Sequence, residues 1–142
     1  MLILVAVVGV LISIVLPTFS KIKENQVLKN GVEDILSLIN KARGETLSSL
    51  NSSEYGVHFQ PDKVIIFKGK VFSASAPDNE SISIITPASI TNVMLGGISG
   101  TSGDIYFKRL SGAPSSTGTL TISTSTYSRI ITISTTGVAS VN

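Results

Sequence analysis

Cysteine is absent from the sequence, and histidine occurs once, as His58. The lack of thiols excludes disulfides, thiolate catalysis and cysteine-based zinc sites. A single histidine also excludes a histidine-rich metal centre and the two-histidine helix of zinc proteases. Charge is scarce as well, because charged residues make up 14% of the chain, against roughly 25% in typical soluble domains. With a net charge of only +2, charge alone gives no reason to expect nucleic-acid binding.

Sequence motifs of catalysis or ligand binding are missing too. Ser111 is followed by no predicted helix and has no histidine partner, so it does not fit a nucleophile elbow, and the glycine-rich stretch 96–100 lacks the lysine and the helix of a phosphate-binding loop. His58 has no acidic or cysteine neighbour in sequence and fits an ordinary strand histidine. The carboxylates at expected turns or strand starts, where such groups are usually solvated, are Asp62, Asp78, Glu80 and Asp104. We therefore predict a protein that is not an enzyme, with no catalytic residue, no metal site and no cofactor.

What the sequence does contain is an uninterrupted hydrophobic run at its start, Leu2–Leu16. Pro17 ends this run, and Lys21 and Lys23 follow. A surface helix of a soluble domain buries only one stripe, so a helix that is apolar on every side is expected in lipid or among identical helices. The run is shorter than the roughly 20 residues that cross a bilayer, and we expect apolar residues upstream of Met1 to complete it. A cleaved signal peptide fits less well, because no basic residue precedes the run and no small-residue cleavage pattern follows it.

The next stretch of the chain is amphipathic. Its apolar side chains recur every three or four residues with charged residues mostly between them, which indicates a helix with one buried stripe. The stripe consists of Leu28, Val32, Ile35, Leu36, Ile39, Ala42, Leu47 and Leu50. We predict a single helix over residues 1–51, weakened or kinked at Pro17 and about 75 Å long. Asn51-Ser52-Ser53 is expected to end it.

From Glu54 onward the hydrophobic period changes to two, and Ser, Thr, Gly, Ile and Val predominate. This pattern predicts short antiparallel strands, placed at 55–59, 63–72 with a break at Gly69, 81–86, 90–95, 104–110, 119–124, 129–135 and 138–141. Gly96–Gly103 is expected to be a loop. The predicted fold is α+β, a long hydrophobic-then-amphipathic helix packed on an antiparallel β-sandwich or curled sheet. Its parts are the hydrophobic half of the helix (1–27), the amphipathic half (28–53) and a β-rich head (54–142).

The segment from Gly9 to Phe19 (GVLISIVLPTF) resembles the N-terminal signature of type IV pilins and pseudopilins. In that family a glycine precedes an apolar octet ending in Leu-Pro, followed by a small or polar residue and an aromatic residue. The positions that match by type and spacing are Gly9, Leu16, Pro17 and Phe19. The head is similar to the GspH/FimT branch, the H-type pseudopilins and minor pilins. The similar pieces are 55–59, 105–107 leading to Ser111-Gly112, and 129–138.

This resemblance implies a structural subunit of a type IV pilus or a type II secretion pseudopilus, with the pilin fold. The residues expected in the core of the filament are Leu2, Leu4, Val8, Gly9, Leu11, Leu16, Pro17 and Phe19. The implied partners are other copies or other pilins, an inner-membrane assembly platform and a prepilin peptidase. The implied location is the bacterial inner membrane with a single pass, then a periplasmic pseudopilus or an extracellular pilus. The processing site, the methylated residue and the acidic residue of the family are expected upstream of Met1.

Two alternatives stay open at this point. One is a minor pilin at the tip, which contacts DNA or a surface through Lys108 and Arg109, within a basic patch that includes Lys68, Lys70, Phe67, Phe72, Tyr106 and Phe107. DNA-binding members of the branch carry a basic tail after the last glycine, whereas here no arginine follows Gly137, so nucleic acid is not an expected partner. The other alternative is a single-span membrane protein with an external β domain.

Overall fold

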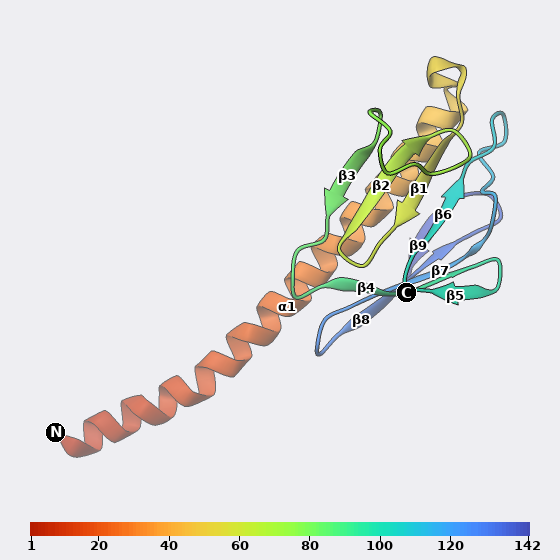
Figure 1. Ribbon diagram of the computed structural model, residues 1–142. Coiled ribbons are helices and arrows are strands. Elements are labelled where there is room, and N and C mark those ends of the chain that lie inside the picture. The colour runs from red at the N-terminus through yellow and green to blue at the C-terminus, as the bar shows by residue number, and fades with distance from the viewer.

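The computed structural model describes residues 1–142 and contains one long helix and nine strands. Helix α1 (Leu2–Leu47) has 46 residues and is therefore about 69 Å long. A short 3₁₀ turn, η1 (Leu50–Ser52), connects it to the strands. Figure 1 shows the N-terminal half of α1 projecting as a free rod, while the C-terminal half lies against the sheets. The predicted α+β fold, a long helix packed on antiparallel strands, is confirmed.

The strands form two antiparallel sheets that do not close into a barrel. The four-stranded sheet contains β1 (Tyr55–Phe59), β2 (Lys63–Lys68), β3 (Glu80–Ser83) and β6 (Gly103–Tyr106), in the order β3-β2-β1-β6. The five-stranded sheet contains β4 (Ser89–Leu95), β5 (Ile98–Gly100), β7 (Gly118–Ser123), β8 (Ser128–Ile133) and β9 (Ala139–Val141), in the order β5-β4-β7-β8-β9. Among the strands of this second sheet, Arg129 is the single charged residue, so its surface is made mostly of hydroxyl and apolar groups.

The hydrophobic core lies between the two sheets and the C-terminal half of α1. Alternate strand residues such as Phe59, Leu120 and Ile131 are fully buried, as the period of two predicts. The helix contributes a stripe of buried residues at helical spacing: Leu28, Gly31, Val32, Ile35, Leu38, Ile39, Ala42 and Thr46. Gly31 lets the sheet approach closely, because a Cβ there would lie 3.0 Å from Ile122 Cδ1.

The buried stripe ends earlier than the sequence predicted. Leu47 and Leu50 were expected within it, but they are 40% and 45% exposed. The helix ends at Leu47, because Ser49 and Asn51 adopt positive φ angles of 52° and 51° that turn the chain towards β1. The last buried helical position is instead Thr46, which the hydrophobic pattern could not reveal.

Helix α1 passes through Pro17 without a break, so the predicted kink is absent from this structure. Figure 1 shows gentle curvature along the rod rather than a sharp bend. Hydroxyl groups on both sides of Pro17 bond within the helix, from Ser13 Oγ to the Gly9 carbonyl at 2.8 Å and from Thr18 Oγ1 to the Ile14 carbonyl at 3.3 Å. The proline removes one backbone donor, and the surrounding turns nevertheless keep helical geometry.

Three strand predictions also need correction. The stretch Gly96–Gly103, expected to be a loop, contains β5, which pairs with β4 through a hairpin that Gly96 and Gly97 turn with φ of 58° and 83°. The strand expected at 104–110 ends at Tyr106, and Leu110 has a φ of 73°. The strand predicted over 63–72 ends at Lys68, where Gly69 has a φ of 100°, and it does not resume after this break.

Candidate functional site: the exposed stem of the helix

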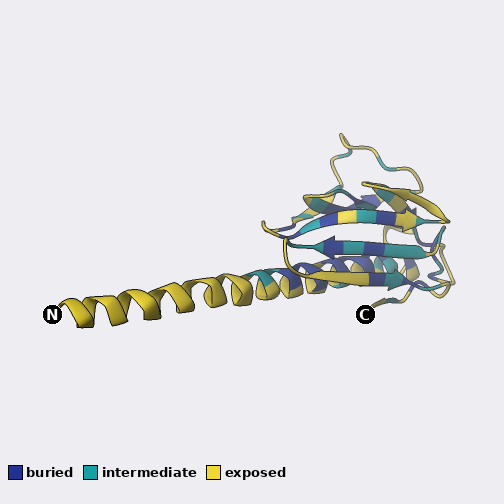
Figure 2. Ribbon diagram, turned by 90° about the horizontal axis from the view of Figure 1, so that it is seen from below, coloured by how far each residue is buried: buried dark blue, intermediate teal, exposed yellow.

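The first half of α1 touches nothing else in the molecule, and we call Leu2–Lys23 the stem. Every residue of the stem is exposed, as Figure 2 shows by its uniform colour up to the point where the helix meets the sheets. Leu2 is 88% exposed and Phe19 is 69% exposed. All the residues expected in a filament core therefore lie together on one bare rod: Leu2, Leu4, Val8, Gly9, Leu11, Leu16, Pro17 and Phe19.

The length of the stem matches the thickness of a membrane. No charged side chain occurs from Leu2 to Ser20, and at about 1.5 Å per residue this stretch is about 28 Å long, close to the roughly 30 Å of a bilayer's hydrocarbon core. The structure thus has one helix that is long and apolar enough to cross a membrane. From the sequence we considered only the run before Pro17, Leu2–Leu16, which is too short to cross a bilayer. Continuity of the helix through Pro17 adds the residues up to Ser20.

One face of the stem is smooth and closely approachable. Ala6, Gly9 and Ser13 follow one another at helical spacing, and a Cβ added at Gly9 would meet nothing within 4 Å. The hydroxyl of Ser13 is already bonded to the Gly9 carbonyl, so this face offers packing and no free donor. Small residues at such spacing allow two helix backbones to approach closely in an apolar environment.

A polar contact marks the junction between the stem and the head. Ser125 Oγ, in the turn between β7 and β8, donates to the carboxylate of Glu24 with 3.1 Å to each oxygen. Leu28, one turn further along the helix, is fully buried. Sequence reasoning missed this contact because the two residues are far apart in the chain and neither belongs to a motif.

The basic residues proposed as a surface contact lie at the other end of the head. Lys108 and Arg109 follow β6, and both are exposed. Arg109 Nη1 donates to the Ser52 carbonyl at 3.2 Å, so this side chain fastens the chain after α1 to the loop after β6. The aromatic residues Phe67 and Phe107 are buried and take no part in such a surface, whereas Lys70 Nζ lies 5.8 Å from the centre of the Tyr106 ring.

His58 has an acidic neighbour that the sequence did not suggest. It lies opposite Asp104 in the β1–β6 register, with 4.0 Å between His58 Nδ1 and Asp104 Oδ1. The imidazole stacks on Phe72 with 3.9 Å between ring centroids, and Gln60 Nε2 lies 3.2 Å from His58 Nε2. Burial lowers the pKa of His58 below 6.5, and the charge of Asp104 opposes this shift only in part. The neutral, stacked ring acts as a packing group of the four-stranded sheet.

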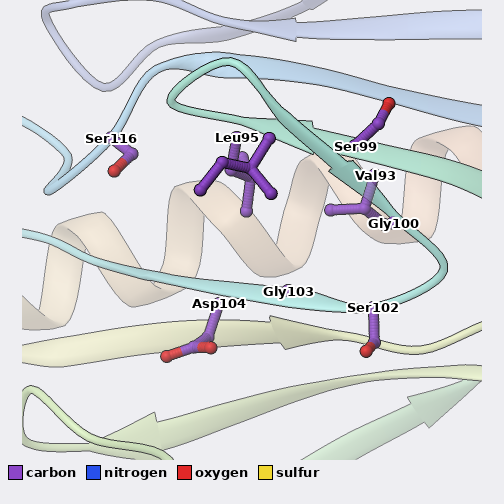
Figure 3. A pocket seen from close by; sticks show the side chains of 9 residues that line it. Val93, Leu95, Ser99, Gly100, Ser102, Gly103, Asp104 and Ser116 are labelled. Atoms are coloured by element: carbon purple, nitrogen blue, oxygen red, sulfur yellow. The ribbon is translucent and has the colours of Figure 1, made fainter.

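A small open cleft of about 220 Å³ lies between β6 and the β4–β5 hairpin. Figure 3 shows Val93 and Leu95 on one side of β6, while the side chains of Ser102 and Asp104 extend away from them. A Cβ at Gly103 would lie 3.0 Å from Leu95 Cδ1, so these apolar side chains already cover the strand. The polar groups around the cleft do not converge on a common point, and the cleft has no arrangement that could perform acid–base chemistry.

The candidate functional site is therefore the bare apolar stem. It offers hydrocarbon surface that can be buried against another apolar surface. A lipid bilayer and a bundle of similar helices both provide such burial. Comparison of the chain with protein-family models, with curated proteins and with solved structures finds no match.

Proposed function

We propose that this protein is a structural subunit of a type IV pilus or of a type II secretion pseudopilus, and that it assembles through its stem. The observation that carries the proposal is the fully exposed apolar stem, which continues without interruption into the helix at the centre of the head's core. The sequence of Gly9–Phe19, with its similarity to the pilin signature, supports the same function. The order of parts, helix first and β-rich head second, agrees with it.

The energetics of the stem favour any surroundings that remove it from water, either lipid or neighbouring stems. Burying one Leu, Ile or Val side chain away from water contributes about 1.5–3 kcal/mol. The stem bears such side chains on every face, so even partial burial of several of them exceeds the roughly 4–15 kcal/mol that association costs in lost freedom of motion. The stem is therefore not stable in water. It resides in a bilayer before assembly and among copies of itself or other pilins afterwards.

The head then forms the outer surface of the filament. Under this proposal, the subunit has a single pass through the bacterial inner membrane before assembly and is placed in a periplasmic pseudopilus or an extracellular pilus. A prepilin peptidase and an inner-membrane assembly platform are the further partners that the resemblance implies. A role as a minor subunit at the tip is the second candidate. Exposed Lys108 favours it, because its neighbour Arg109 bonds the Ser52 carbonyl at the end of the head away from the stem.

A charge placed in the stem tests the proposal in cells that make the filament. We expect Val8→Lys to abolish incorporation into fibres, because a lysine among packed stems has no water or headgroup to reach. Membrane insertion should persist, since the lysine costs about 2.5–3.5 kcal/mol at the centre of a span while each remaining apolar residue contributes about −0.3 to −0.6 kcal/mol. The measurements are immunoblots of sheared fibres and of the membrane fraction.

Thr101→Lys is the matched control, because it adds the same charge to an exposed turn between β5 and β6, far from the stem. This variant should enter fibres like the unaltered chain. Normal fibres with Val8→Lys would contradict the proposal. If the unaltered chain stays a monomer in the membrane and no fibre contains it, the single-span membrane protein is correct instead. A bulk share of the purified fibre indicates a major subunit, and a trace indicates a tip subunit.

A further inference from the structure

The turn between β7 and β8, Thr124–Tyr127, lies on the side of the head that faces the stem (Figure 1). Its backbone is fixed by a hydrogen bond from the Thr124 N–H to the Tyr127 carbonyl at 2.8 Å. The Tyr127 N–H also donates to Thr124 Oγ1 at 3.1 Å. These bonds use no atom of the Tyr127 side chain, and Tyr127 as a whole residue is 37% exposed. The turn thus has a fixed backbone and carries a partly exposed tyrosine.

The contact between Glu24 and Ser125 fixes the position of this turn along the helix. Ser125 Oγ lies 3.1 Å from both oxygens of the Glu24 carboxylate. Glu24 comes four residues after Ser20, the last residue of the uncharged stretch, and four residues correspond to about 6 Å along a helix axis. The turn is therefore about 6 Å beyond the end of the uncharged stretch Leu2–Ser20.

At this distance from the hydrocarbon core, a bilayer has its headgroup layer. Its hydrocarbon core is about 30 Å thick and its full width about 40–45 Å, which leaves about 5–7.5 Å of headgroup on each side. With Leu2–Ser20 in the hydrocarbon, the β7–β8 turn falls within the headgroup layer. Tyrosine is the kind of residue that settles there, and Lys21 and Lys23, which are exposed at the same height, attract anionic headgroups.

We infer that the β7–β8 turn, together with Lys21 and Lys23, binds phospholipid headgroups and so holds the head against the membrane surface before assembly. We call this interaction the headgroup contact. The inference rests on the proposed function only in that the stem spans a bilayer before assembly. The headgroup contact attaches the protein to the membrane at a second place besides the stem. It holds the head end-on to the bilayer, and entry into a filament breaks the contact.

Tryptophan provides the test, because the chain has none. Tyr127→Trp places a single fluorophore in the turn, and Thr126→Trp provides a second probe at an exposed neighbour. Tyr106→Trp is the matched control. Tyr106 pairs with Gly56, next to Tyr55, whose N–H bonds Thr46, so it lies about 33 Å further along the helix than Glu24. The full-length variants are reconstituted into vesicles of phosphatidylcholine and phosphatidylglycerol that contain lipids brominated near the headgroup.

We expect a blue shift and a loss of emission for the Tyr127 and Thr126 probes and neither change for the Tyr106 probe. Lys21→Ser combined with Lys23→Ser should weaken the loss in anionic vesicles. Flotation of the vesicles reports stem insertion separately. If the chains float with the vesicles and no turn probe is quenched, the headgroup contact is refuted while the stem's membrane role stands. Equal quenching of all three probes refutes it as well, because the head would then lie flat. Chains that fail to float overturn the inference and the proposed membrane stage together.

Discussion

Thr46 is the polar residue of the core whose replacement most directly tests how α1 is joined to the sheets. It is fully buried. Its Oγ1 accepts a hydrogen bond from the Tyr55 N–H at 2.9 Å and donates one to the Ala42 carbonyl at 2.9 Å. We predict that Thr46→Val destabilises the head, although valine has nearly the same shape and leaves no cavity.

The size of the effect follows from the partner that is left behind. The Tyr55 N–H would be buried without an acceptor, and such an orphaned donor costs about 1–3 kcal/mol. The Ala42 carbonyl remains available to the helix, so we assign it no further cost. Thr46→Ser is the matched control, because it keeps the hydroxyl and loses one methyl group, which costs about 0.8 kcal/mol.

Urea unfolding of the full chain in nonionic detergent, followed by near-ultraviolet circular dichroism, measures the free energy of unfolding. Hydrogen exchange of the Tyr55 amide separates the two variants, since it should accelerate in Thr46→Val and stay protected in Thr46→Ser. A Val variant as stable as the unaltered protein, with a protected Tyr55 amide, would show that the hydroxyl does not join helix and sheet as argued.

Further predictions concern two glycines and the histidine. Gly137→Ala should cost about 2–5 kcal/mol, from a left-handed backbone and from overlap of the new Cβ with the Gly112 carbonyl oxygen. Gly97→Ala, equally left-handed but in open space, should cost only about 1–2 kcal/mol in the same unfolding assay. NMR titration should give His58 a pKa below 6.5. Asp104→Asn should lower the His58 pKa further, because the charge of Asp104 raises it. In the unaltered protein, His58 has a lower pKa in the folded chain than in the unfolded chain, so the unfolded chain binds the proton more tightly. The free energy of unfolding should therefore fall as pH drops through about 6.5 and level off below the folded pKa. A His58 pKa at or above 6.5 would contradict this account.

The sequence predicted the long helix, most of its buried stripe and most strands, because each has a local period that burial imposes. Val57 and Phe59, or Leu120 and Ile122, alternate so regularly that only their partners were unknown. The missed strand β5 lies between glycines, whose flexibility also fits a loop, and it forms only because β4 offers a free edge. Pairing across the sheet is a property of the folded chain, so it left no local signal.

The candidate site divides in the same way. The apolar run Leu2–Leu16 was identified from composition alone, since a helix apolar on all sides is recognisable from the sequence, whereas Pro17 and Phe19 were added by the resemblance to the pilin signature. The contact of Glu24 with Ser125 and the neighbourhood of His58 and Asp104 join residues that are distant in the chain. Such contacts depend on the order of strands, which hydrophobic periodicity does not determine. Arg109 looked free in the sequence, but the fold uses it to bond the Ser52 carbonyl.

Because the stem and the spine of the head are one unbroken helix, the two cannot rotate independently. A slip of the stem by one residue against its neighbours would turn it by about 100° and raise it by about 1.5 Å. The head would swing through the same angle, since no linker absorbs the torque. Under the proposed function, the register in which stems pack therefore determines which side of the head faces outward.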